Sequence, residues 1–248
     1  MIFTPQEQKK LRKFLERLNS KDVPYVILRD YRNLPHSVQG GDVDIFTLPN
    51  EFRNVISLAV QLNIRHNKIT GLSQIYNVGF SKPFFAIKKM INAPRYSVDW
   101  VNNTLFGNPA DTLGSHEWTG KFGQLQVHLS SKMYYSSPWL GGKYQVNTKV
   151  QNSLISNRVF TGEFWVPSPP DHLVHLLCRG LFDRRGDFPE YYVKSCYNLY
   201  RDMNNDERDR LNELLRLVFF NADVTVENAL SKKNLSNLLD NLQSYSNY

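Results

Sequence analysis

A proline-rich segment, Val-Pro-Ser-Pro-Pro at residues 166–170, separates two kinds of hydrophobic pattern. Before it, short β-branched runs alternate with amphipathic segments, whereas after it the apolar residues recur at helical spacing. Consecutive prolines continue neither a helix nor a strand ladder, so the segment acts as a stop and a hinge. The pattern predicts an α+β chain: a mixed β-sheet with flanking helices in residues 1–160, followed by a C-terminal helical module in residues 161–248.

The expected helices share an apolar face that repeats every three or four residues. They cover residues 5–19, 51–62, 150–155, 171–181, 191–203, 206–220 and about 234–245. The expected strands are short runs that alternate or are rich in β-branched residues. They cover residues 23–28, 41–46, 64–69, 74–80, 96–101 and 125–129. Residues 84–91 fit either a short helix or a continued strand.

Composition restricts the classes of protein to which the chain can belong. Of its 248 residues, 41% are hydrophobic and 21% are charged, which supports a buried core and excludes disordered and collagen-like chains. No apolar run is long enough to span a membrane and no signal peptide is recognisable, so we expect a cytoplasmic protein. Cys178 and Cys196 fit buried thiols better than a disulfide framework or a zinc site. A net charge of +7 favours phosphate-bearing partners.

Two aspartates at alternate positions, Asp42 and Asp44, are the strongest chemical signal in the sequence. On a strand, side chains two residues apart lie on the same face, so the two carboxylates share one side while their apolar neighbours face the core. Close carboxylates repel each other, and a divalent cation such as Mg²⁺ is the usual partner that offsets this repulsion. The alternative is solvated turn chemistry, in which Gly40 and Gly41 simply make the bend.

The stretch from Val26 to Asp30 (Val-Ile-Leu-Arg-Asp), followed by Gly-Asp-Val-Asp-Ile at residues 41–45, resembles the DNA polymerase beta superfamily of nucleotidyltransferases. The signature of that superfamily is an apolar residue with a Gly-Gly or Gly-Ser pair, a spacer, and then Asp-apolar-Asp/Glu-apolar. Residues 31–41 form the spacer in this chain. The resemblance is greatest to uncharacterised bacterial nucleotidyltransferase-like proteins, many linked to surface-polysaccharide genes, which also begin a helical tail with Val-Pro-Ser-Pro.

This resemblance implies a nucleotidyltransferase-like sheet and a metal-dependent transferase. A nucleotidyl or related phosphoryl group would pass from a nucleoside triphosphate to a small acceptor, such as a sugar or sugar phosphate. Two Mg²⁺ (or Mn²⁺) ions would neutralise the triphosphate and align the attacking hydroxyl. Asp42 and Asp44 would be catalytic metal ligands.

A third acid is expected from a later strand, and two segments compete for that place. Asp99 lies between apolar residues in Ser-Val-Asp-Trp-Val and is the first choice as the third catalytic and metal-binding carboxylate. By its position in the chain, the strand at residues 123–129 is the better match, but it carries Gln126 and His128 where relatives have an acid. His128 fits a metal ligand, a base or a structural histidine.

The nucleotide-binding residues follow from the same resemblance. In the superfamily a Gly-Ser turn cradles the phosphates, and Arg29 and Asp30 stand in its place here. Arg29 would bind phosphate as a bidentate donor with support from Arg32, and the Gly40-Gly41 loop would add backbone contacts. Asp30 would ligate metal, pair with a nearby arginine, or bond to its own backbone in a turn.

Two other functions share the fold. The chain could be a catalytically degenerate nucleotidyltransferase that acts as a nucleic-acid or protein binding module, or a toxin or tRNA-modifying transferase that differs only in its acceptor. Basic groups on one face away from Asp42 would favour the binding module, whereas their convergence on Asp42 and Asp44 would favour catalysis. The basic groups in question are Lys9, Lys10, Arg12, Lys13, Arg17, Lys88, Lys89 and Arg95.

Two further groups of residues carry less weight. Arg179, Arg184 and Arg185, near Tyr191 and Tyr192, form either a basic and aromatic corner for a nucleotide or an ordinary helix C-terminus.

His172 and His175 lie three residues apart on one expected helix, so both could point at one ligand.

Overall fold

The computed structural model describes residues 1–38, 41–66, 116–136 and 143–243. The expected strands at 74–80 and 96–101 and the ambiguous residues 84–91 lie outside the described residues. Contacts within the chain define two compact units. The first comprises residues 1–68, 113–133 and 146–172, and the second comprises residues 69–112, 134–145 and 173–248. Compact units need not coincide with domains, so the division at residue 160 stays a prediction.

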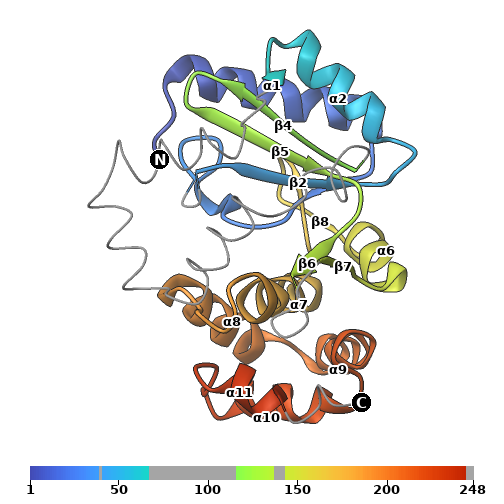
Figure 1. Ribbon diagram of the computed structural model, residues 1–248. Coiled ribbons are helices and arrows are strands. Elements are labelled where there is room, and N and C mark those ends of the chain that lie inside the picture. Colours follow the sequence, from blue (N-terminus) through green and yellow to red (C-terminus); the bar gives the residue numbers. More distant parts are fainter. Residues whose placement is uncertain (39–40, 67–115, 137–142, 244–248) are drawn as a thin grey trace. The chain divides into compact units, whose positions relative to one another are not determined.

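A five-stranded mixed sheet forms the centre of the first unit (Figure 1). In spatial order, its strands are β1 (Tyr25–Ile27), β2 (Val43–Thr47), β5 (Leu125–Ser130), β4 (Glu117–Phe122) and β3 (Arg65–His66). The β2 and β5 strands are parallel, and the other neighbouring strands are antiparallel. The prediction of an α+β chain with a mixed sheet and flanking helices is therefore confirmed.

Two helices flank this sheet, α1 (Pro5–Ser20) and α2 (Phe52–Gln61). The α1 helix begins where its sequence predicts, because Thr4 and Glu7 form a capping box that satisfies backbone N–H groups of the first turn. The Glu7 carboxylate also accepts a hydrogen bond from the backbone N–H of Gln124 in the β4–β5 turn. One buried side chain thus ties the start of α1 to the sheet.

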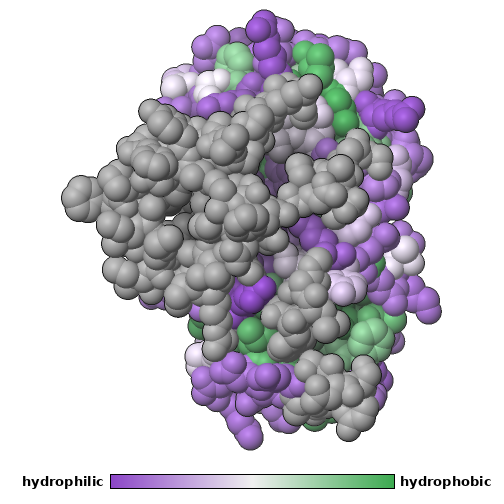
Figure 2. All heavy atoms as spheres, in the orientation of Figure 1, coloured by the Kyte–Doolittle hydropathy of each residue, from purple (hydrophilic) through white to green (hydrophobic). Residues whose placement is uncertain are grey.

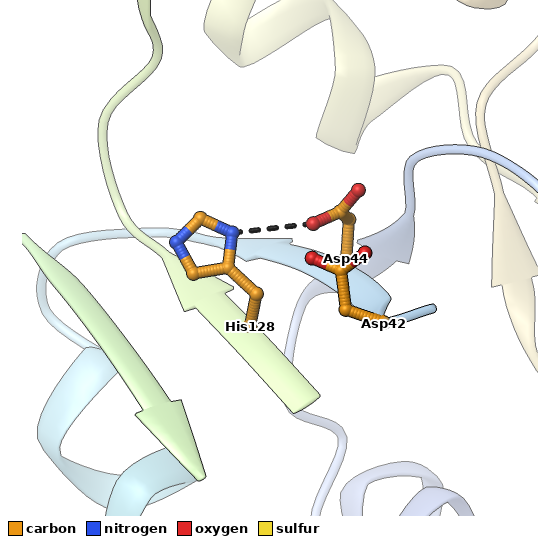
Figure 3. Close-up of side chains that lie close together, drawn as sticks. All are labelled: Asp42, Asp44 and His128. Atoms are coloured by element: carbon orange, nitrogen blue, oxygen red, sulfur yellow. Dashed lines mark hydrogen bonds and ion pairs between the residues drawn. The ribbon is translucent and has the colours of Figure 1, made fainter. Parts of the chain in front are cut away.

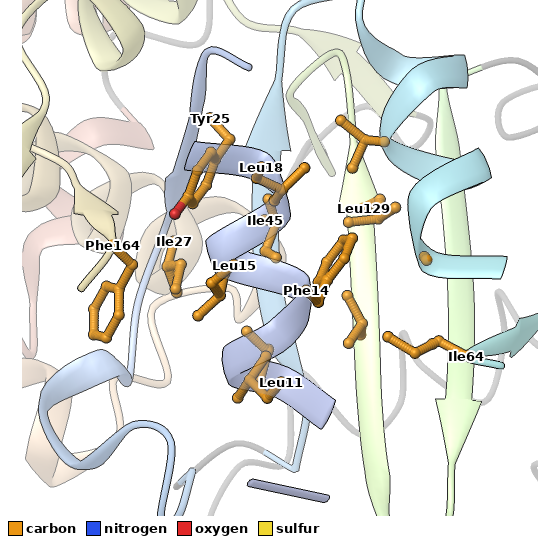
Figure 4. Close-up of a cluster of buried hydrophobic side chains, with 14 of the residues drawn as sticks. Leu11, Phe14, Leu15, Leu18, Tyr25, Ile27, Ile45, Ile64, Leu129 and Phe164 are labelled. Carbon is orange, nitrogen blue, oxygen red and sulfur yellow. The ribbon is translucent and has the colours of Figure 1, made fainter. Parts of the chain in front are cut away.

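Figure 4 shows the core between α1 and the sheet. The α1 helix contributes four buried apolar side chains, Leu11, Phe14, Leu15 and Leu18. Ile45 of β2 and Leu129 of β5 belong to the same cluster. Because side chains alternate along a strand, burying Ile45 on this face directs Asp44 to the other face of the sheet. Core packing therefore decides which side of the sheet carries the acidic residues.

No strand was expected at β4, because Gly120 and Gly123 in the sequence indicate breaks in a strand pattern. Gly120 lies within the strand, where a Cβ atom would stand 2.1 Å from the Trp118 ring and 2.7 Å from Ile64. This close approach, rather than a turn, explains the glycine. Gly123 has a φ of +60° and begins the two-residue turn to β5, where a positive φ suits hairpin geometry.

The rest of the first unit includes α6 and a short hairpin. The bounds are Thr148–Ser156 for α6, Val159–Phe160 for β8 and Trp165–Val166 for β9. The helix α7 (Pro169–Cys178) begins two residues before the expected start at Asp171. Asp171 is therefore not the N-cap, since its buried carboxylate instead accepts hydrogen bonds from the hydroxyls of Ser153 and Ser168.

The second unit combines a two-stranded ribbon with helices. The ribbon pairs β6 (Tyr134–Ser136) with β7 (Lys143–Gln145), and a π-helical turn, Arg179–Asp183, continues from α7. The following helices are α8 (Glu190–Asp202), α9 (Asn205–Phe219), α10 (Asp223–Ser231) and α11 (Leu238–Leu242). Among the described residues, no helix has the length and apolar character needed to cross a membrane.

The end of the chain differs from the prediction of one helix at residues 234–245. The structure has α10 before this range, and the short α11 is the helix among the described residues within it. Val224, Thr225 and Val226 disfavour a helix by intrinsic propensity, which hid α10 from the sequence analysis. Val226, Ala229 and Leu230 are nevertheless buried at helical spacing, so tertiary packing outweighs that propensity.

Candidate functional site

Three side chains that can ligate a metal ion meet on one face of the sheet: Asp42, Asp44 and His128 (Figure 3). One ligand atom from each residue lies within 4.8 Å of the others. Asp44 on β2 and His128 on β5 are register partners in the parallel pair, and Asp42 directly precedes β2. Strand alternation brings the two aspartates together, and strand pairing adds the histidine.

The His128 ring lies between two carboxylates. Its Nδ1 atom is 3.2 Å from Oδ1 of Asp44, and its Nε2 atom is 3.7 Å from Oε2 of Glu117 on β4. Burial by itself lowers the pKa of His128, but hydrogen bonds and charge from Asp44 and Glu117 outweigh it and raise that pKa to about 10. The imidazole is therefore a cation at neutral pH in this arrangement.

The guanidinium of Arg29 lies among three carboxylates. Its Nε donates a hydrogen bond to Oδ2 of Asp44, and its other nitrogens lie 3.6 Å from Asp42 and 3.4 Å from Asp30. The side chains of Arg29 and Asp44 are only 8% and 9% exposed, so this ion pair is shielded from water. The guanidinium of Arg29 and the imidazole of His128 thus balance part of the negative charge of these carboxylates.

From the sequence, Arg29 was expected to bind phosphate, and Asp30 was expected to bind a metal ion, a nearby arginine or its own backbone. In the structure, Arg29 contacts Asp42 and Asp44, and Asp30 pairs with Arg29. Asp30 has a φ of +56° and precedes the 3-10 turn Tyr31–Asn33, in which Arg32 is exposed. Gly41 has a φ of +95°, a conformation that suits glycine, directly before Asp42.

Two of the expected site residues, Gly40 and Asp99, lie outside the described residues. Glu117 is a site residue that sequence reasoning missed, because β4 was not predicted and its side chains had no assigned face. The available signal was the order Glu117-Trp118-Thr119, in which a buried residue separates two polar ones. With β4 recognised, this alternation places Glu117 on the same face as His128.

The turn after Asp30 contacts α7 through two rings, the half-buried Tyr31 and the buried His172. The Tyr31 hydroxyl lies 3.0 Å from Nδ1 of His172 on α7. Burial lowers the pKa of His172 to about 4, and the nearby charge of Arg32 acts in the same direction. Burial also raises the pKa of Tyr31 to about 12, against the effect of Arg32. A protonated Tyr31 therefore donates to a neutral His172.

The two histidines of α7 have different partners. His172 contacts Tyr31, whereas Nδ1 of His175 lies 2.8 Å from the hydroxyl of Tyr135. Each ring is held by a phenol, which agrees with a structural role for both histidines.

The remaining groups singled out in the sequence have structural partners too. Arg179 pairs with Asp183 one helical turn later, and the Arg184 guanidinium lies 5.4 Å from the Tyr192 ring. Cys178 and Cys196 are buried free thiols, as predicted. Burial raises the pKa of both thiols, so neither is a reactive thiolate at neutral pH.

A scan against models of protein families matches none of them, and searches among curated proteins and among solved structures find no significant match. A functional interpretation of this chain therefore depends on its own residues and their geometry, together with the resemblance described above.

Proposed function

We propose that this chain is a metal-dependent, nucleotidyltransferase-like protein. It would transfer a nucleotidyl or related phosphoryl group from a nucleoside triphosphate to a small acceptor, such as a sugar or sugar phosphate. The observation that supports this proposal is the convergence of Asp42, Asp44 and His128, whose ligand atoms lie within 4.8 Å of one another. Such a site suits a divalent cation that also contacts substrate phosphates.

The local charge supports the same proposal. Asp30, Asp42, Asp44 and Glu117 bring four carboxylates to the site, against the guanidinium of Arg29 and the imidazole of His128. Among the described residues, these carboxylates outnumber the protein cations even when His128 is protonated. A divalent cation bound to Asp42 and Asp44 would add positive charge that attracts a triphosphate.

Asp42 and Asp44 would hold the ion, with His128 as the third ligand in the place where an acid was expected. Because only a neutral imidazole ligates a metal, His128 would release a proton when the ion binds. The bound cation would neutralise phosphate oxygens as the acceptor hydroxyl attacks phosphorus and the bond to pyrophosphate breaks. Arg29 would exchange partners, because a cation on Asp42 and Asp44 competes with its guanidinium. The released guanidinium would be available to a phosphate as a bidentate donor.

The test is a calorimetric and thermal-shift titration with each nucleoside triphosphate, with and without Mg²⁺, Mn²⁺ or Co²⁺. We expect metal-dependent binding in the wild type and its loss in Asp42→Asn, whose side chain is partly exposed and tolerates the change better than that of Asp44. Glu16→Gln, an exposed acid on α1, is the matched control. Metal-independent triphosphate binding, or none in the wild type, would contradict the proposal.

A second candidate is a catalytically degenerate fold that binds nucleic acid. The observation in its favour is a set of cations on α1: Lys9, Lys10, Arg12, Lys13 and Arg17. The α1 helix covers the sheet face opposite to Asp44, and Figure 2 shows mostly hydrophilic surface at this end of the first unit. Lys88, Lys89 and Arg95 lie outside the described residues.

The α1 cations favour binding, whereas Arg29 favours catalysis because it converges on Asp42 and Asp44. Fluorescence anisotropy with single-stranded RNA separates the two candidates. A binding module would lose affinity steeply with salt and would bind more weakly after Lys9→Gln/Lys13→Gln, with no effect of Asp42→Asn. The preferred function predicts the reverse dependence for triphosphate.

A further inference from the structure

We infer that the cluster of Asp42, Asp44 and His128 binds a metal ion that favours nitrogen ligands, such as Co²⁺ or Zn²⁺, more tightly than Mg²⁺. Glu117 positions His128 for this ion. This inference rests on the metal site of the proposed function and names the class of ion that the site takes. It departs from the Mg²⁺ expected from the sequence, because a third carboxylate is replaced by an imidazole.

The donor set of the cluster combines two carboxylates with one imidazole. Mg²⁺ prefers oxygen ligands in octahedral geometry and keeps several of its waters, so two carboxylates suit it and an imidazole does not. Imidazole is a good ligand for Zn²⁺ and its transition-metal neighbours, whose affinities for mixed nitrogen and oxygen sites exceed those of the earlier divalent ions. Among the residues of this cluster, His128 is therefore the one that discriminates between ions.

The imidazole of His128 is oriented by a carboxylate on each side. Nδ1 of His128 faces Asp44 at 3.2 Å, and Nε2 faces Glu117 at 3.7 Å, so the ring has an inner and an outer nitrogen. Histidines that ligate metals usually donate their other ring N–H to a carboxylate, which fixes the ring and strengthens the ligand. Glu117 occupies that outer position here.

The sheet explains why Glu117 acts through His128 rather than as a ligand. On β4, Thr119 is the register partner of His128 and Glu117 is the partner of Ser130, so Glu117 reaches the ring diagonally from the far side. The three residues whose ligand atoms gather within 4.8 Å do not include it. Glu117 is therefore a positioning residue, and its side chain is only 19% exposed.

The test compares Co²⁺, Zn²⁺ and Mg²⁺ by calorimetry, with the visible absorption of bound Co²⁺ as a second readout. We expect wild type to bind Co²⁺ at least about 100-fold more tightly than Mg²⁺. Glu117→Gln should weaken Co²⁺ binding by roughly 10- to 100-fold and change its absorption bands, because the ring loses its carboxylate partner. His128→Asn should abolish the preference, whereas the control Glu16→Gln should leave it unchanged.

Each outcome decides the inference. Equal affinities for Co²⁺ and Mg²⁺ in the wild type would overturn it without any variant, so it stays falsifiable even if Glu117→Gln does not fold. An unchanged Co²⁺ spectrum in a folded Glu117→Gln would overturn the role of Glu117. If the protein binds Co²⁺ selectively but binds no triphosphate, the proposed transferase function is wrong and the inference about the ion stands. If Mg²⁺-dependent triphosphate binding is the same in His128→Asn as in the wild type, this inference is wrong and the proposed transferase function stands.

Discussion

Asp44 and His128 face each other across the parallel pair of β2 and β5, with Oδ1 of Asp44 3.2 Å from Nδ1 of His128. The other carboxylate oxygen of Asp44 accepts a hydrogen bond from Arg29. Asp44 is therefore a buried anion between two cations, and its environment differs from that of the more exposed Asp42. The two aspartates of the motif have the same chemistry but different structural importance.

Asp44→Asn should lower the free energy of unfolding by about 3 kcal/mol, because it leaves the buried charge of Arg29 without its closest counter-ion. Asp42→Asn should cost less than about 1 kcal/mol, since Asp42 is 23% exposed and 3.6 Å from the guanidinium. Urea unfolding of both variants at pH 7 measures the difference. Equal losses would show that Arg29 depends on the two carboxylates alike.

Arg29→Gln should strengthen binding of a divalent cation by roughly tenfold, because it removes a positive charge that competes for Asp42 and Asp44. The same variant should weaken metal-dependent triphosphate binding, since the phosphate donor is lost. Calorimetry with the metal alone and then with metal and triphosphate separates the two effects. Arg53→Gln, an exposed arginine on α2, is the control. Weaker metal binding in Arg29→Gln would contradict the exchange of partners.

Local patterns predicted the parts of the fold that local chemistry determines. The capping box of Thr4 and Glu7 starts α1, and the alternation around Asp44 sends its carboxylate away from the core. These features depend on neighbours within a few residues, so one sequence suffices to predict them. The pairing of β2 with β5 is a long-range relationship, and no local pattern contains it.

The site residues that the sequence did not predict depend on such long-range strand pairing. His128 was considered without its partner, because its register with Asp44 is set by strand pairing across more than 80 residues. Glu117 was not considered at all, since Gly120 concealed the strand that carries it. Arg29 was expected to contact phosphate, and its place on the aspartates depends on the fold of the β1–β2 segment.

Gly120→Ala should destabilise the first unit by roughly 2 kcal/mol, because the added methyl overlaps the Trp118 ring and Ile64 in a packed core. Trp118→Phe removes the ring atoms closest to this position, so the double variant should lose less stability than the two single losses combined. Thermal unfolding of the three variants measures this coupling. Additive losses would contradict the steric explanation for the glycine.

His172 should make the protein sensitive to mild acid. It is buried and neutral in the fold, where its pKa is about 4 compared with an ordinary value of 6.5, and it accepts a hydrogen bond from Tyr31. Between these two pH values the unfolded chain binds a proton that the folded chain does not. The stability contributed by this neutral histidine is therefore complete above pH 6.5 and falls as the pH drops toward 4, by about 3 kcal/mol in total.

His172→Asn tests this dependence, because an amide oxygen still accepts from Tyr31 but does not titrate. Urea unfolding between pH 7.5 and pH 4 should show a shallower loss of stability in the variant than in the wild type, with the two curves converging toward acid. His36→Asn replaces an exposed histidine and controls for substitution alone. Parallel curves for wild type and His172→Asn would mean that His172 takes up its proton within the folded protein, so that the pair with Tyr31 does not keep it neutral.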